Sequence, residues 1–525
     1  MKKNDLIEVT IEDLGTNGEG IGKTGTFPLF VKDAVIGDRV LARLTKVKKN
    51  YAFARTEKVL EPSPYRVEPP CPISRQCGGC QIQPLSYEKQ LEWKNRKVKG
   101  HLQRLGGFPA DLIERIMEEP LASEKPFRYR NKMAVPFGKD KEGQLVAGFY
   151  AGRTHQIIPV MDCMLGQKVN AEILQIILSY MEAYGIEPYD EKSGKGLVRH
   201  VLIRIGAHSG QIMVCLILNG EKLPFADRLV EALCRIEGMS SVMININTEN
   251  TNVILGKKTA VLWGKDHIQD SLCGIRFSIS PLSFYQVNPL QAEKLYQKAL
   301  DYADLHGEET VWDLYCGIGT ISLCLAKKAK KVYGVEIVER AIEDAKKNAA
   351  DNQIENAEFY VGAAENVFTE AMESRGDEAR PDVVVVDPPR KGCDQKLLET
   401  MLRMRPERIV YVSCDSATMA RDLKILCADG SYQLKKACCV DQFSQSVHVE
   451  SVVLLGREIV NDKNVEYMHV DYEPEDNEYL KGIKGSATYA EIKKWIKEQY
   501  NVSVSSLYIA QCKDACGFEK HYGVC

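Results

Sequence analysis

The sequence lacks long hydrophobic segments. Its longest apolar runs, such as Ile212–Leu218, fall far short of the roughly 20 apolar residues that a membrane-spanning helix requires. The first residues, Met1 to Asp5, also lack the apolar core of a secretory signal. We therefore expect a cytoplasmic protein that makes no membrane contact.

The sequence also lacks a marked net charge. A formal charge of −3 over 525 residues excludes a protein that binds nucleic acid through its overall charge. Two segments depart from this balance, because residues 42–58 contain six Lys or Arg against one Glu, and residues 88–104 contain six against two. Both are candidates for phosphate contacts, although solvated loops and helix faces can have the same composition.

Cysteine, in contrast, is plentiful, with 17 in the chain. Without a secretory signal, these residues favour metal binding or thiol catalysis over a disulfide framework. Cys71, Cys77 and Cys80 surround two glycines within ten residues, which is a strong metal signature. Cys163 is the best candidate for a fourth ligand. The spacing fits zinc and an iron–sulfur cluster equally well.

The chain is expected to be multidomain. Short apolar runs separated by turns predict a small β-barrel of the OB type over residues 1–60. Such barrels commonly bind RNA on a basic, aromatic face, and an all-β module with another purpose is the alternative. The candidates for that face are Arg43, Lys46, Lys48, Lys49 and Tyr51.

Residues 61–283 predict a central α+β domain that contains the cysteine cluster. A charged helix is expected over about 86–105, and the helical segment 86–120 is expected to pack on the domain formed by residues 284–458. The remaining elements are strands over 127–137, 146–159 and 197–218, and a helix over 170–184.

Residues 284–458 alternate helices and strands, which predicts an α/β, Rossmann-like domain with an open parallel sheet covered on both faces. A final strand over 450–455 would close the sheet. Residues 459–480 predict an acidic linker, with seven acidic residues and one lysine after residue 460. Residues 481–525 predict a small helical tail that starts at a capping box, Thr488–Glu491.

A glycine turn follows the strand expected over 309–315. In Asp313-Leu314-Tyr315-Cys316-Gly317-Ile318-Gly319, the glycines allow a ligand to approach the backbone closely. The next strand ends in Glu336, whose carboxylate can accept hydrogen bonds from both hydroxyls of a ribose. Two glycines, instead of the three usual for NAD, favour S-adenosylmethionine. A purely structural turn is the alternative.

Three more side chains are expected near the same edge of the sheet. Asp387, in an Asp-Pro-Pro-Arg sequence, and Cys414 each follow an apolar strand, and such strand ends are where parallel sheets bind ligands. The Cys414 thiolate could be a nucleophile, and Glu450, before the last strand, could be a base. Alternatively, Asp387 caps a helix, Cys414 is inert and Glu450 faces solvent. Arg390 stands where amino-group methyltransferases usually have an aromatic residue.

Together these motifs resemble the RNA uracil-C5 methyltransferase family, and in particular its bacterial 23S ribosomal RNA branch. The likeness covers residues 1–458, with an N-terminal barrel that this family calls TRAM. The tRNA-directed branch usually lacks both the barrel and the cysteine cluster. Besides that cluster, the matching motifs are Phe284-Tyr285-Gln286-Val287-Asn288, the glycine turn, Asp-Pro-Pro-Arg, Ser413-Cys414 with Ala417 and Arg421-Asp422, and His448-Val449-Glu450.

The resemblance implies S-adenosylmethionine-dependent methylation of uridine C5 in 23S rRNA by a monomer. Cys414 would add to C6 of the base, Glu450 would remove the C5 proton and Phe284 would stack on the target base. The barrel and segment 88–104 would bind the RNA. The implied cofactor contacts are Gln286, Tyr315, Glu336 and Asp387, and the implied ligands of a structural 4Fe–4S cluster are Cys71, Cys77, Cys80 and Cys163.

Two positions depart from the family pattern. Thr320 replaces a frequent Asn, which would alter a side-chain contact to the cofactor. Asp415-Ser416 follows Cys414 in place of Asn-Pro, so we expect a less rigid loop and a negative charge that opposes thiolate formation unless Asp415 points away. The rival functions are a tRNA uracil-C5 methyltransferase, an amino-directed methyltransferase and a non-catalytic RNA-binding iron–sulfur protein.

Overall fold

Five short strands at the N-terminus close into a barrel in the order β1-β2-β3-β5-β4. Alternate residues point inward, so that side chains such as Val9, Ile11, Val40 and Leu44 form one small apolar core. The predicted barrel is confirmed. The strands are β1 (Leu6–Leu14), β2 (Gly20–Thr24), β3 (Phe27–Lys32), β4 (Arg39–Val47) and β5 (Ala52–Glu61).

The structure is a computed structural model that describes residues 1–152, 154–458, 493–494 and 497. The predicted acidic linker, and the predicted helical tail apart from its three described residues, lie outside this part of the chain. None of the described helices has the length and apolar content needed to span a membrane.

The central α+β domain contains a mixed sheet in the order β12-β11-β10-β9-β6-β7-β8. Two helices, α3 (Val169–Ala183) and α4 (Ala226–Leu233), pack in a shared apolar core with its strands. A hairpin, β13 and β14, leads to the next domain. The strands are β6 (Lys132–Lys139), β7 (Leu145–Tyr150), β8 (Ile157–Pro159), β9 (Val198–Ile205), β10 (Ile212–Leu218), β11 (Met239–Ile246), β12 (Lys258–Gly264), β13 (Ile268–Leu272) and β14 (Ile275–Ile279).

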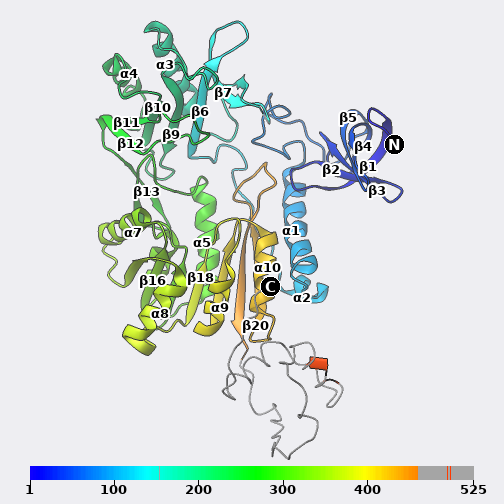
Figure 1. The fold of residues 1–525 in the computed structure, drawn as a ribbon, viewed down its shortest axis with the longest axis vertical. Helices are drawn as coiled ribbons and strands as arrows, with labels where there is room; N and C mark the ends of the chain where they lie inside the picture. Colours follow the sequence, from blue (N-terminus) through cyan, green and yellow to red (C-terminus); the bar gives the residue numbers. More distant parts are fainter. Residues whose placement is uncertain (153, 459–492, 495–496, 498–525) are drawn as a thin grey trace, which may run out of the picture. The chain divides into compact units, whose positions relative to one another are not determined.

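The C-terminal sheet has the order β17-β16-β15-β18-β19-β21-β20, and Figure 1 labels β16, β18 and β20 in that succession across it. The first five strands are parallel, whereas β21 runs antiparallel to both β19 and β20, so the expectation of a parallel sheet holds for five strands only. The strands are β15 (Thr310–Leu314), β16 (Lys331–Glu336), β17 (Ala357–Val361), β18 (Val383–Val386), β19 (Arg408–Ser413), β20 (Tyr432–Val440) and β21 (Glu450–Arg457).

Helices cover both faces of this sheet. The apolar core on one face includes α5 (Pro289–Ala303), α6 (Thr320–Ala326) and α7 (Glu339–Asp351). The core on the other face includes α8 (Ala364–Arg375), α9 (Gln395–Met404) and α10 (Ser416–Leu426), and it also includes the early helices α1 (Tyr87–Arg104) and α2 (Ala110–Ile116). Helix α1 therefore shares a core with the C-terminal sheet and lies beside α10 (Figure 1).

Candidate active site

Three of the predicted cofactor residues lie at one edge of the C-terminal sheet. Tyr315 follows β15, Glu336 ends β16 and Asp387 follows β18. These strands are neighbours in the order β16-β15-β18 and run in the same direction, so their carboxyl ends lie together. The connections reverse direction at β15, and such a point in an α/β sheet is where ligands bind.

The loop after β15 has an unusual backbone. Tyr315, Gly317 and Gly319 all have positive φ angles, of 70°, 56° and 82°. Residues other than glycine rarely adopt this backbone conformation. A Cβ atom added at Gly319 would lie 3.1 Å from the ring of Phe359, whereas one added at Gly317 would meet nothing within 4 Å. The backbone at Gly317 is therefore open to a ligand.

Carboxylates concentrate around this loop. Asp313 is buried, and burial, together with the charges of Asp387 and Glu336, raises its pKa to about 7. One of its oxygens accepts a hydrogen bond from Ser322, but Oδ1 has no partner among the described residues. Burial also raises the pKa of Asp387 to about 6. An unpaired buried oxygen among three acids suits the ammonium and sulfonium groups of S-adenosylmethionine.

Gln286 and Thr320 meet at a tyrosine that sequence reasoning missed. The Gln286 Nε2 atom donates to the Tyr296 hydroxyl at 3.3 Å, and the same hydroxyl lies 3.3 Å from Thr320 Oγ1. Thr320, which replaces the family's usual Asn, is thus hydrogen-bonded to Tyr296 of helix α5. Gln442 Nε2 also donates to Gln286 Oε1 at 3.3 Å. Tyr296 lies in a regular amphipathic helix, so nothing in the sequence marks it.

Cys414 and Glu450 lie across from each other between two antiparallel strands. Ser413, at the end of β19, pairs with Ser451 in β21, so Cys414 falls opposite Glu450. Burial, with the charges of Glu450 and Asp387, raises the pKa of the Cys414 thiol to about 11. Burial and Asp387 raise the pKa of Glu450, whose exposed fraction is 6%, to about 8. The alternative of a solvent-facing Glu450 is wrong.

Arg390 supplies a cation beside this pair. Its charge lowers the pKa of both Cys414 and Glu450, against the larger effect of burial. Its guanidinium lies 3.5 Å from Nδ1 of His448. The sequence did not assign Arg390 to the site, and its place in the Asp-Pro-Pro-Arg motif, three residues after Asp387, was the signal that could have identified it.

Asp415 does not direct its charge at the thiol. Its Oδ1 atom accepts the backbone N–H groups of Ala417 at 2.9 Å and Thr418 at 3.2 Å, which caps the N-terminus of α10. The carboxylate thereby interacts favourably with the helix dipole. The cap also anchors the loop that lacks the family's usual proline.

The four candidate metal ligands are close to one another. Burial raises the pKa values of Cys71, Cys77 and Cys80, that of Cys80 to about 12, and the charge of Cys163 adds to each rise. The N–H group of Gly79 donates to Cys77 Sγ at 3.4 Å. Within the described residues, however, no group of three or more His, Cys, Asp or Glu side chains is arranged to hold a metal ion.

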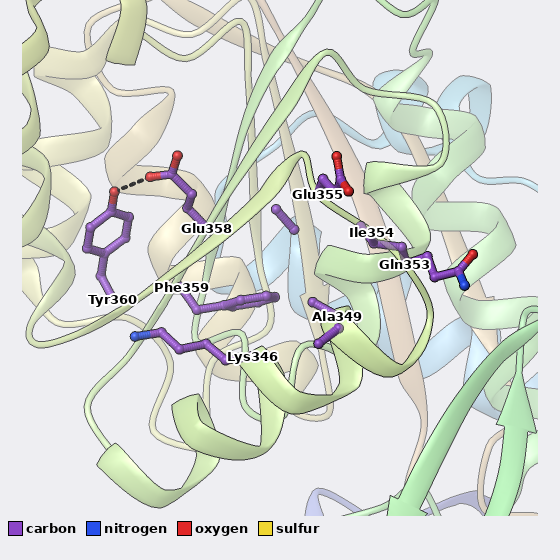
Figure 2. A pocket seen from close by; sticks show the side chains of 10 residues that line it. Lys346, Ala349, Gln353, Ile354, Glu355, Glu358, Phe359 and Tyr360 are labelled. Atoms are coloured by element: carbon purple, nitrogen blue, oxygen red, sulfur yellow. Dashed lines mark hydrogen bonds between the residues drawn. The ribbon is translucent and has the colours of Figure 1, made fainter.

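Two further features lie on the surface of the protein. Phe284 is 70% exposed, so its ring is accessible to a base. A hollow at α7 and the edge strand β17 is lined by side chains that include Lys346, Phe359 and Tyr360 (Figure 2). None of the predicted site residues lines this hollow.

The basic helix α1 directs part of its positive charge into the protein. Lys94 and its partner Asp441 are each 1% exposed, at 2.5 Å from nitrogen to oxygen, so Lys94 is excluded as a phosphate contact. Lys99 pairs with Glu114 at 2.6 Å, and Arg96 pairs with Asp13 of the barrel at 2.8 Å.

The strand order, the glycine turn and the acidic edge define an S-adenosylmethionine-dependent methyltransferase fold. A family model described as tRNA (Uracil-5-)-methyltransferase matches residues 240–458, and a TRAM domain model matches residues 2–56. The chain belongs to this RNA uracil-5-methyltransferase family, because it is 49% identical over 456 residues to a protein of Clostridium tetani described as an uncharacterized RNA methyltransferase, covering 87% of this chain and 97% of the relative.

Two further comparisons agree with this assignment. A similarly described RNA methyltransferase of Listeria monocytogenes is 49% identical over 455 residues, covering 87% of this chain and 98% of the relative. The crystal structure of the Pyrococcus abyssi tRNA (uracil-54, C5)-methyltransferase in complex with S-adenosyl-L-homocysteine has a TM-score of 0.68 and 28% identity, covering 86% of this chain and 100% of that chain.

The raised pKa of Glu450 predicts a pH-dependent gain in stability for Glu450→Gln. Between the ordinary value of 4.5 and the folded value of about 8, the folded protein keeps a proton that the unfolded chain has released, so this residue lowers stability as pH rises. The variant should therefore unfold at a higher temperature than the wild type at pH 9, with little difference at pH 4.5. Thermal unfolding followed by fluorescence across this range measures the effect.

The matched control is Glu399→Gln, at an exposed position of α9, which should change stability by less than about 0.5 kcal/mol. A stability difference for Glu450→Gln that is the same at pH 4.5 and pH 9 would show that the buried carboxyl group is not the cause.

Proposed function

We propose that this protein methylates C5 of uridine in RNA with S-adenosylmethionine as the methyl donor, and that 23S rRNA is its substrate. The observation that carries the proposal is the placement of Cys414 opposite Glu450, beside Asp387 and Arg390. A thiol next to a buried carboxyl group provides a nucleophile and a base within reach of one ring.

The chemistry assigns a separate role to each side chain. C5 of uracil is a weak nucleophile, so the Cys414 thiolate first adds to C6, and the C5–C6 electron pair moves toward C5 and O4. S-adenosylmethionine, when bound, supplies the methyl group that C5 takes up. The Glu450 carboxylate then removes the C5 proton, the C5–C6 double bond re-forms, and the C6–S bond breaks to release the thiolate.

The environment of the site suits this sequence of charges. Arg390 favours both the thiolate and the negative charge that spreads over the pyrimidine. Asp313, Glu336 and Asp387 place negative charge where the donor's cationic groups would bind, and Glu336 is positioned for the ribose hydroxyls. Tyr315 follows β15 at the same edge, and Gln286 is held by hydrogen bonds with Tyr296 and Gln442. The target uridine must leave its stack for the thiol to reach the ring face, and the exposed Phe284 is the side chain proposed to stack on it.

RNA containing 5-fluorouridine provides the direct test of these roles. Addition and methyl transfer leave fluorine on C5, which cannot depart as a proton does, so the enzyme should remain covalently bound to the RNA. Cys414→Ala should abolish both this adduct and methylation of ordinary RNA. Glu450→Gln should form the adduct and, with ordinary uridine, should accumulate the methylated covalent intermediate. Denaturing gels and labelled S-adenosylmethionine measure both. Methylation by Cys414→Ala at the wild-type rate would remove the assigned nucleophile.

Two RNA classes compete as the substrate. The TRAM barrel and the cysteine cluster support 23S rRNA, whereas the similarity to an enzyme named for tRNA uracil-54 supports tRNA. Unmodified transcripts of 23S rRNA and of tRNA should be methylated side by side, and 5-methyluridine should be mapped by nuclease digestion and mass spectrometry. We expect 23S rRNA to be methylated faster. Faster methylation of tRNA would establish the second candidate, and binding without turnover would contradict both.

We further propose that Cys71, Cys77, Cys80 and Cys163 hold a 4Fe–4S cluster as a structural staple. Four soft sulfur donors with mutually interacting charges suit such a cluster, and the Gly79 N–H group can donate to a sulfur ligand. Protein purified without oxygen should be brown, with broad visible absorption and about four iron atoms per chain. Cys80→Ser should lose this absorption and iron, while Cys427→Ser, remote from the cluster, should keep both. Stoichiometric zinc in place of iron would contradict the proposal.

A further inference from the structure

One face of helix α1 carries polar side chains that point into the protein. Gln90, Lys94, Lys97 and His101 are separated by four, three and four residues, which places them along one stripe of the helix. Gln90 and Lys94 are buried, and Lys97 and His101 are half-buried. Burying such groups is costly unless each finds a partner, so their partners indicate what the stripe does.

The first three members contact the segment that leads to Glu450. The Gln90 Nε2 atom donates to Gln445 Oε1 at 3.0 Å, and the Gln445 N–H group donates back to Gln90 Oε1 at 3.2 Å. Lys94 Nζ pairs with Asp441 and donates to the Phe443 carbonyl at 3.1 Å. Lys97 Nζ donates to the Val447 carbonyl at 2.9 Å.

This segment needs external support because it is irregular. Gln445 has a φ angle of 69°, a conformation that costs a non-glycine residue free energy unless its surroundings impose it. The reciprocal amide pair with Gln90 fixes that residue. Glu450 follows five residues later, at the start of β21.

The fourth member contacts the nucleophile's side of the site. His101 Nδ1 lies 2.8 Å from Ser416 Oγ, at the first residue of α10 and two residues after Cys414. Burial and the charges of Lys97 and Arg104 lower the pKa of His101, which favours its neutral ring, and one of the two atoms donates a hydrogen bond to the other. Helix α1 thus contacts the chain segments next to both proposed catalytic groups, Cys414 and Glu450.

We propose that the α1 stripe of Gln90, Lys94, Lys97 and His101 is a positioning element that sets the placement of Glu450 relative to Cys414. Gln90, Lys94 and Lys97 position the base, and His101 positions the nucleophile. This inference rests on the proposed function, since it assigns positioning roles for that reaction. A buried ion pair such as Lys94–Asp441 adds little stability over apolar side chains of similar size, so its value lies in fixing one geometry.

The two ends of the stripe should affect different chemical steps. Trapping by 5-fluorouridine requires Cys414 but no proton removal, whereas turnover of ordinary uridine requires both groups. Lys97→Met and Gln90→Leu should therefore form the 5-fluorouridine adduct at nearly the wild-type rate, lose turnover by about tenfold or more, and accumulate the methylated covalent intermediate. His101→Ala should instead slow adduct formation itself, and His101→Asn, which keeps a hydrogen-bonding group, should restore part of the rate.

The experiment measures adduct formation and turnover on the RNA transcript that the preceding assay finds methylated. Lys396→Met is the matched control, because Lys396 is an exposed lysine of α9, outside α1 and the proposed RNA-binding segment, and both rates should stay at the wild-type level. Lys94→Met paired with Asp441→Leu tests the buried pair without leaving a lone charge, and thermal unfolding identifies any variant that fails to fold.

Unchanged turnover in folded Lys97→Met and Gln90→Leu, or an equal loss of adduct formation and turnover, would overturn the positioning role of the stripe. The proposed function fails in a different way, through adduct formation or methylation by Cys414→Ala. The two hypotheses are therefore distinguishable in one set of assays.

Discussion

The antiparallel pairing of β21 with β19 is the constraint on which the candidate site depends. In a sheet of parallel strands alone, only the residues that follow the carboxyl ends of the strands reach the ligand-binding edge. A strand that returns in the opposite direction brings its first residue to that edge instead. Because Ser413 pairs with Ser451, the residue that follows β19 falls opposite the residue that opens β21. A slip of one residue would turn Glu450 to the other face.

The surroundings at this edge of the sheet disfavour the charged forms of its acidic groups. Asp313, Asp387 and Glu450 all have raised pKa values because burial disfavours their charged forms, and the charge of Asp387 adds to the rise for Asp313 and Glu450. The same surroundings disfavour the Cys414 thiolate. A bound cationic donor would relieve the repulsion among the carboxylates and so favour ionisation of the neighbouring groups. Binding of a positively charged ligand would therefore lower the free energy needed to ionise these buried groups.

The alternation of helices and strands in residues 284–458 was predictable because buried parallel strands, such as Val383–Val386, are continuous apolar runs between amphipathic helices. The directions of β20 and β21 were not, since apolar periodicity carries no information on orientation. Candidate residues at strand ends were also predictable, because strand ends lie where ligands bind. The inward orientation of Lys94 was not, because its partner Asp441 lies 347 residues away and a lysine in a charged helix normally faces water.

The loop after Cys414 shows how two different physical devices can serve one purpose. A proline rigidifies a loop mainly by restricting the unfolded chain, which is worth about 0.4–1 kcal/mol. This chain has Asp415 and Ser416 there instead, and the Asp415 cap on α10, worth about 1 kcal/mol, is of similar size. The cap restrains only the start of the helix, however, whereas the Ser416 hydroxyl ties that start to His101 on α1. The loop after Cys414 is therefore coupled through Ser416 to α1, a helix that precedes the C-terminal domain in the sequence.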